Sequence, residues 1–155
     1  MSLIKDIRTI CNNNTFHGRI VIILLYLERY FRIKFLFALF RRLVIQSTYN
    51  VVLNPKCFRS LDAIVSLKLP HPYFIVVHQE TSIGNYCSIY QGVTIGSTEK
   101  KGEYHNLAYI GDNVLIGVKS TILGGVKIGN NAKIGAHALI LKDINDGETA
   151  LGLWK

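Results

Sequence analysis

The sequence has few cysteines, and their spacing excludes two kinds of site. Cys11, Cys57 and Cys87 are the only three in 155 residues, and no two of them have CxxC spacing. An odd number of isolated thiols is not a disulfide framework or a cysteine zinc site. Closely spaced histidines are missing too, so we predict no metal. We expect reduced thiols in a cytoplasmic protein, at most touching the inner face of the membrane.

Long apolar runs are also missing. From Phe16 to about Ile45 the longest uncharged stretches are Ile20 to Leu27 and Phe35 to Phe40, far short of the ~20 residues that span a bilayer. The N-terminus offers no apolar signal core. We therefore predict an N-terminal helical region over 1–50, with a short helix first and then two helices, or one bent helix, from Phe16 to about Ile45. This region is expected to cover one end of the following domain. Alternatively, its basic, aromatic-rich face contacts an anionic membrane.

Acidic residues are scarce. There are 10 Asp and Glu against 18 Lys and Arg, which gives a net charge of +8. Such a chain favours an anionic partner: nucleic acid, a phosphate-bearing cofactor or a membrane surface. No nucleic-acid reading motif accompanies the charge, so we expect no nucleic acid partner. The GxSxG and GxxxxGK[ST] motifs are absent as well.

The dominant pattern is an isoleucine every six residues in the second half of the chain. A glycine follows six of these isoleucines, and a small or branched residue stands four positions after most of them. The isoleucines in register are Ile83, Ile89, Ile95, Ile110, Ile116, Ile122, Ile128, Ile134 and Ile140. A period of six fits neither an α-helix nor a flat sheet, and it is typical of a parallel β-helix of hexapeptides. We predict such a domain over 51–155, with the isoleucines inward and the glycines relieving crowding near the corners.

Two irregularities in this pattern carry the candidate catalytic residues. Counting back in sixes from Ile83 reaches Val77 and His71, so the β-helix is expected to start, imperfectly, near Leu61. Ile95 and Ile110 are fifteen residues apart, so part of 97–109 must leave the coil as a loop, which carries His105. A neutral imidazole suits general-base catalysis, and either histidine is a candidate. His78 and His137 fall at outward positions and are expected to be merely exposed.

A family resemblance emerges from the stretch HPYFIVVHQETSIGNYCSIYQGVTIGSTEKKGEYHNLAYIGDNVLIGVKSTILGGVKIGNNAKIGAHALIL. It resembles the catalytic half of the serine acetyltransferases, and also the related O-acetyltransferases of bacterial exopolysaccharide and capsule clusters. The match covers about 50–152. It implies a left-handed β-helix, a homotrimer and acetyl-CoA as the donor.

The resemblance also implies site residues. His71 would be the general base that takes the proton of the acceptor hydroxyl, and His105 would line the same site across a subunit interface. The cofactor would lie in a groove between neighbouring β-helices. Its expected contacts are Gly96, Gly117, Val118, Lys133, Gly135 and Ala136.

The sequence departs from the family at three positions. Pro70 stands where serine acetyltransferases have an aspartate, Val52 replaces the acid that orients the base, and Tyr104 replaces the arginine that binds the serine carboxylate. A tyrosine cannot form the bidentate pair that arginine forms with a carboxylate. We therefore predict an O-acetyltransferase of cell-surface polysaccharide biosynthesis, whose acceptor is a small-molecule or lipid-linked saccharide, with Tyr104 facing the acceptor. The alternatives are serine acetyltransferase proper and a non-catalytic trimeric scaffold.

Overall fold

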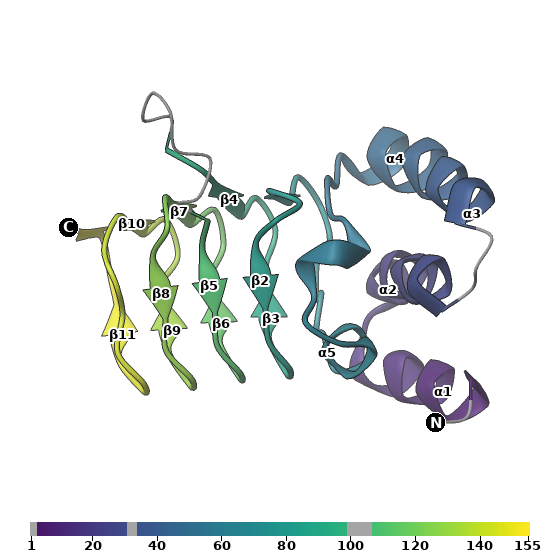
Figure 1. Ribbon diagram of the computed structural model, residues 1–155, viewed down its shortest axis with the longest axis horizontal. Helices are drawn as coiled ribbons and strands as arrows, with labels where there is room; N and C mark the ends of the chain where they lie inside the picture. Colours follow the sequence, from purple (N-terminus) through teal and green to yellow (C-terminus); the bar gives the residue numbers. More distant parts are fainter. Residues whose placement is uncertain (1–2, 31–33, 99–106) are drawn as a thin grey trace.

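The structure is a computed structural model that describes residues 3–30, 34–98 and 107–155. Tyr104 and His105, two of the predicted site residues, lie outside the described residues. Figure 1 shows two parts, a stack of helices at one end and a β-helix that extends from it to the C-terminus.

The first fifty residues form the expected helices. Their bounds are α1 Leu3–Asn13, α2 Phe16–Tyr30, α3 Lys34–Arg41, a π-helical turn η1 Arg42–Gln46 and α4 Ser47–Tyr49. The start of α2 is set by Thr15, whose hydroxyl accepts a hydrogen bond from the backbone N–H of Gly18 at 3.4 Å. One face of α2 is fully buried and packs against α5 and the first coil of the β-helix.

The β-helix consists of three parallel sheets of very short strands. Sheet A has the order β1-β4-β7-β10-β12, sheet B the order β2-β5-β8, and sheet C the order β11-β9-β6-β3. The strand bounds are β1 Val76–Val77, β2 Ser82–Ile83, β3 Ser88–Ile89, β4 Thr94–Gly96, β5 Tyr109–Ile110, β6 Leu115–Ile116, β7 Thr121–Leu123, β8 Lys127–Ile128, β9 Lys133–Ile134, β10 Leu139–Ile140, β11 Thr149–Ala150 and β12 Leu153–Trp154. Up to β10 each strand pairs with the third one after it, because three hexapeptides complete one coil, and in the last coil sheet B is reduced to the bridge between Ile128 and Ile144. This confirms the predicted fold class, a left-handed parallel β-helix with an N-terminal helical region.

The isoleucine ladder is the core of this domain. Partners lie directly above one another, for example Ile95 on Ile122 and Ile122 on Ile140. All nine isoleucines are at most 1% exposed. A fully buried isoleucine contributes roughly 1.5–3 kcal/mol through the area that it removes from water, so the ladder supplies most of the cohesion between coils.

The corners turn at a position that the sequence pattern did not reveal. The residue three places after the isoleucine adopts a left-handed conformation at Tyr86, Asn113, Lys119, Asn131 and His137, with φ between 54° and 59°. The glycine directly after the isoleucine has another role, because at Gly111 and Gly117 an added Cβ would lie within 3 Å of the backbone of the next coil. The predicted relief of crowding is thus confirmed at these positions.

The predicted start of the β-helix was wrong. Parallel bridges join Val52 to Val76, Phe58 to Ile83 and Lys68 to Ser88, so a first coil already begins at Val52. The 3-10 turn η2 Pro55–Cys57 and the helix α5 Leu61–Val65 interrupt this coil. The inward position before Val77 therefore belongs to Leu69, which is fully buried, and not to His71.

Candidate functional site

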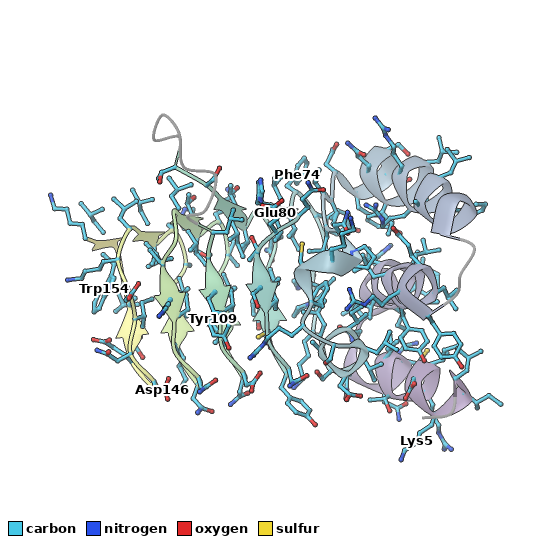
Figure 2. All side chains as sticks on the ribbon, in the orientation of Figure 1. Lys5, Phe74, Glu80, Tyr109, Asp146 and Trp154 are labelled. Carbon is cyan, nitrogen blue, oxygen red and sulfur yellow. The ribbon has the colours of Figure 1, made fainter. Side chains whose placement is uncertain are left out.

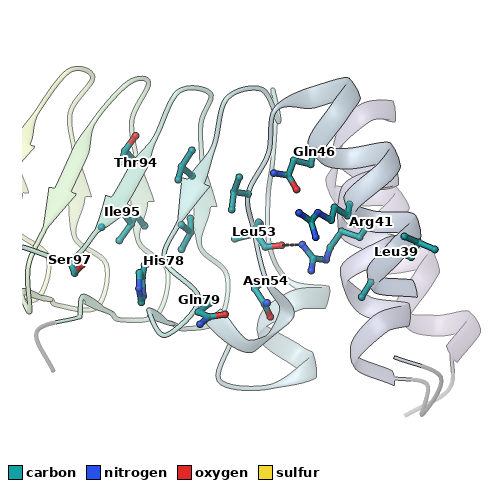
Figure 3. A pocket seen from close by; sticks show the side chains of 16 residues that line it. Leu39, Arg41, Gln46, Leu53, Asn54, His78, Gln79, Thr94, Ile95 and Ser97 are labelled. Carbon is teal, nitrogen blue, oxygen red and sulfur yellow. Dashed lines mark hydrogen bonds between the residues drawn. The ribbon is translucent and has the colours of Figure 1, made fainter. Parts of the chain in front are cut away.

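A pocket of about 770 Å³ lies on the outer face of sheet A, under α3 and η1. We call it the sheet-A pocket. Its floor consists of outward side chains of the first three coils, Val52, Val76 and Thr94. Figure 3 shows the strands on one side of it and the helix on the other. A pocket of this size with an apolar floor and a few converging polar groups is typical of small-molecule sites.

An ion pair holds the helical wall of the pocket in place. The Nε of Arg41 lies 2.6 Å from Oε2 of Glu28 on α2, and its Nη1 donates to the backbone carbonyl of Leu53 at 3.2 Å (Figure 3). Both charged side chains are less than a fifth exposed. Because a partly buried charge pair is costly to break, Arg41 fixes α3 relative to the first coil.

The wall continues through η1, whose residues Arg42 and Gln46 also line the pocket. π-Helical turns are rare and are frequently found at functional sites. Here α4 follows the π-helical turn directly. The next residue, Asn50, has a φ of 50° and turns the chain into the first coil.

His78 stands at the far end of the pocket, beside Gln79 and Ser97 (Figure 3). Its backbone N–H donates to the carbonyl of Ile95 at 2.9 Å, and its Nδ1 accepts from the backbone N–H of Glu80 at 3.3 Å. The residue is half-buried. The prediction that His78 is merely exposed was therefore wrong, because the corner between sheets A and B turns its side chain to the pocket wall.

His71 lies elsewhere, at the corner that leads from sheet C into sheet A. It is exposed, and its carbonyl accepts a hydrogen bond from the backbone N–H of Tyr73 at 2.9 Å. The preceding residue, Pro70, is bound to α2 because its carbonyl accepts from the hydroxyl of Thr15 at 2.9 Å. The ring of Tyr73 packs against His17, at 5.9 Å between ring centroids. The role of His71 as a base stays a prediction.

The predicted cofactor contacts fall into two groups. Gly117 and Val118 lie on the coil next to Gly135 and Ala136, and the N–H of Gly117 donates to the carbonyl of Ile134 at 2.9 Å. Exposed Lys133 precedes them on β9. These five share the edge between sheets C and A, the same edge as His71. Gly96 lies apart from them, at the end of β4 in the sheet-A pocket.

Cys57 and Cys87 are not candidate nucleophiles. Burial raises the pKa of both Cys57 and Cys87 to about 11, so at neutral pH they are protonated and unreactive. Among the described residues, no cluster of three or more His, Cys, Asp or Glu side chains could hold a metal ion. In the same part of the chain, no helix is long and apolar enough to cross a bilayer. The surface contact between the N-terminal helices and an anionic membrane stays a prediction.

Sequence reasoning missed Arg42, Gln46 and His78 as lining residues of one pocket. His78 is more than thirty residues from Arg42 and Gln46 in the chain, and the three meet because α3 and η1 fold back over the first coils. The one available signal was the Arg41-Arg42 pair at the end of an apolar helical stretch.

Three comparisons show which known proteins the chain is similar to. The family described as bacterial transferase hexapeptide (six repeats) matches residues 108–142. A serine acetyltransferase of Helicobacter pylori is 39% identical over 87 residues, which cover 56% of this chain and 50% of that protein.

Solved structures agree with the sequence match. The soybean serine acetyltransferase apoenzyme has a TM-score of 0.66 and 33% identity, over 86% of this chain and 52% of that one. A serine acetyltransferase in complex with CoA has the same TM-score with 28% identity, over 86% and 52%. The chain thus spans about half the length of these relatives. The hexapeptide match, the sequence identity and the shared fold agree, and over its β-helix the chain is similar to hexapeptide-repeat transferases and to serine acetyltransferases.

Proposed function

We propose that the protein is an O-acetyltransferase that transfers the acetyl group of acetyl-CoA to a hydroxyl acceptor. The observation that carries this proposal is the similarity to serine acetyltransferases, together with the CoA complex of a relative that shares the fold over 86% of this chain. A non-catalytic trimeric scaffold is the alternative from another class, and the sheet-A pocket favours the enzyme, because a scaffold needs no such pocket.

Serine is the acceptor that the comparisons favour. The relatives are named serine acetyltransferases, and one solved relative is a soybean enzyme complexed with serine. Nothing in the comparisons supports polysaccharide biosynthesis. A sugar acceptor remains the second candidate because of one specific observation: Val52, at the position of the family's orienting acid, is 43% exposed on the pocket floor. A valine at this position carries no charged group that could bind a small amino acid.

The proposed mechanism uses His71 as the general base. Its imidazole takes the proton of the acceptor hydroxyl while the oxygen attacks the thioester carbonyl. A C–O bond forms, the tetrahedral oxyanion collapses, the C–S bond breaks, and the proton passes to the departing thiolate to give free CoA. His105 is proposed to contact the same substrates, and Tyr104 is proposed to face the acceptor.

The proposed donor site is the edge between sheets C and A. Ala136 is exposed and Val118 half-buried on this edge, where the pantetheine arm would lie, and Lys133 and Lys119 are exposed cations on the same edge that suit the phosphates. Gly96 is proposed to contact the acetyl end from the pocket. Coenzyme A thus fits the residues present.

A homotrimer is the proposed assembly. The outer face of sheet A carries leucines on its last coils, and Leu141 and Leu153 are 42% and 55% exposed. Contiguous apolar residues on an outer sheet face are typical of an interface with another subunit. The proposed location is the cytoplasm, and the three cysteines, all free, support a reducing compartment.

The test is release of CoA thiol from acetyl-CoA with serine and, separately, with a panel of sugars. His71→Ala and His105→Ala test the two histidines separately. Loss of the general base is expected to lower the rate roughly 10²–10⁴-fold, and loss of a positioning residue is expected to lower it less. Turnover on sugars but not on serine would establish the second candidate. If no acceptor releases thiol faster than buffer, the protein is the scaffold.

A further inference from the structure

The proposed general base, His71, has no polar partner for its ring. Catalytic histidines are commonly oriented by a third group that binds the second ring nitrogen. In the part of the chain that the structure describes, no residue forms a hydrogen bond or an ion pair with the imidazole of His71. Val52, at the position of the family's orienting acid, carries no polar group in its side chain. Among the described residues, only the backbone segment that carries His71 is left to set the place of its ring.

Residues 70–74, which we call the base corner, are tied to the N-terminal helices at both ends. At the start of the corner, the carbonyl of Pro70 accepts a hydrogen bond from the hydroxyl of Thr15, the residue before α2, at 2.9 Å. At its end, the backbone N–H of Phe74 donates to the carbonyl of Tyr49, the last residue of α4, at 3.0 Å. Figure 2 shows Phe74 where the β-helix meets the helical part. Two helices therefore hold the corner that carries the base.

An aromatic cluster of His17, Tyr49 and Tyr73 joins these helices to the middle of the corner. The ring centroid of Tyr73 lies 5.9 Å from that of His17 and 5.6 Å from that of Tyr49. His17 and Tyr49 contact each other as well, because the imidazole Nδ1 of His17 lies 3.1 Å from the Tyr49 hydroxyl. Aromatic rings at such distances attract each other in edge-to-face and tilted geometries, and Tyr49 is only 7% exposed. The cluster is therefore a fixed support for Tyr73.

Tyr73 transmits this support to His71. Its backbone N–H donates to the carbonyl of His71 at 2.9 Å, and its own carbonyl accepts from the N–H of Gly92 on the next coil at 2.9 Å. Pro70 and Pro72 stand on either side of His71, and each proline ring fixes its own φ. The corner therefore has few free backbone dihedrals, and the packing of the Tyr73 ring determines where the peptide of His71 lies.

We propose that the aromatic cluster positions the general base, so that packing against the N-terminal helices takes over the task that an orienting acid has in the family. Tyr73 is the central positioning residue, because it contacts both other rings and the peptide of His71. His17 and Tyr49 act through it. This inference rests on the proposed function, since it requires His71 to be the base. It gives the N-terminal helices a part in catalysis, whereas the sequence predicted for them a cover of the β-helix or a membrane contact.

The experiment measures kcat and KM for thiol release from acetyl-CoA by the intact chain, with serine or with the sugar of the panel that supports turnover. Tyr73→Ala is expected to lower kcat about tenfold to a hundredfold, because displacement of a catalytic group by about 1 Å has an effect of this size. The KM for acetyl-CoA is expected to stay unchanged. In a His71→Ala background, Tyr73→Ala is expected to lower the residual rate no further, since a residue that acts through the base has no effect without it.

Three further variants sharpen the result. Tyr73→Phe keeps the ring and is expected to retain most of kcat. His17 is exposed, so His17→Ala leaves the fold intact, and it is expected to lower kcat about threefold to tenfold through the loss of its contacts with both tyrosines. Tyr86→Ala is the control, because it removes a tyrosine that is 66% exposed at a corner between sheets B and C. This control is expected to leave kcat unchanged.

The outcomes separate this inference from the proposed function. If both Tyr73→Ala and His17→Ala keep the wild-type kcat, or lower the rate equally with and without His71, the cluster does not act through the base. Either result overturns the inference and leaves the O-acetyltransferase standing, and so does a loss confined to the KM values. If His71→Ala retains the wild-type rate, the base is another residue and the inference falls with that assignment. If no acceptor gives thiol release, the proposed function and the inference that rests on it are both overturned.

Discussion

Two glycines that look equivalent in the sequence are expected to respond in opposite directions to alanine. Gly96 and Gly111 both follow an isoleucine of the ladder. A Cβ at Gly111 would lie 2.8 Å from the backbone nitrogen of Asn130 and 2.9 Å from the carbonyl carbon of Gly129, both on the next coil. A Cβ at Gly96 would meet only the Cδ2 of Leu123, at 3.5 Å, which is ordinary van der Waals contact.

The magnitude follows from two opposing effects. Overpacking against a backbone that cannot move aside costs about 1–3 kcal/mol. Replacing glycine by alanine also restricts the unfolded chain, which stabilises the folded state by about 0.4–1 kcal/mol where the backbone conformation is compatible. Neither residue has a positive φ. Gly111→Ala is therefore expected to lower the free energy of unfolding by about 1–2 kcal/mol, and Gly96→Ala to raise it by about 0.4–1 kcal/mol.

The assay is thermal and urea unfolding, followed by circular dichroism at one protein concentration so that assembly does not alter the comparison. At about 2–4 °C per kcal/mol for a chain of this size, Gly111→Ala should lower Tm by about 2–8 °C and Gly96→Ala should raise it slightly. Equal shifts of the same sign would refute the reasoning, because they would mean that contact with the next coil does not decide the role of these glycines.

The remaining predictions concern the junction of the two parts and the buried thiols. Asn14→Ala should lower the free energy of unfolding, measured in urea, by about 2–4 kcal/mol. The Asn14 side chain donates to the carbonyl of Leu67 at 2.9 Å and accepts from the N–H of Leu69 at 2.7 Å, and the substitution leaves both backbone groups unpaired. A loss below about 1 kcal/mol would contradict this. In a Cys11→Ser background, Cys57 and Cys87 should react with a maleimide at pH 8 only after unfolding, and rapid labelling of the native protein would contradict their burial. Their folded pKa of about 11 exceeds the ordinary value of 9.0, so stability should fall as pH rises between these two values, which unfolding in urea across that range would measure.

The period of six was sufficient to predict the fold, because each inward side chain is specified by local spacing and repeats without reference to distant residues. Ile83 to Ile140 therefore gave the coils, their register and the interruption after Ile95. The same counting failed in the first coil. There the corner between Leu69 and Val77 takes eight residues instead of six, and the inward position passes from His71 to Leu69.

The candidate site, too, was predicted from the sequence only in part. The sequence, through its resemblance to a family, pointed to His71 and to the edge that carries Gly117 and Gly135, which lie on neighbouring coils and are fixed by the repeat. Only the tertiary structure brought Arg42 over sheet A and turned His78 to the same pocket. Arg42 and His78 line the same pocket because the ion pair between Arg41 and Glu28 holds α3 on the first coils. No local sequence pattern specifies such packing between distant segments.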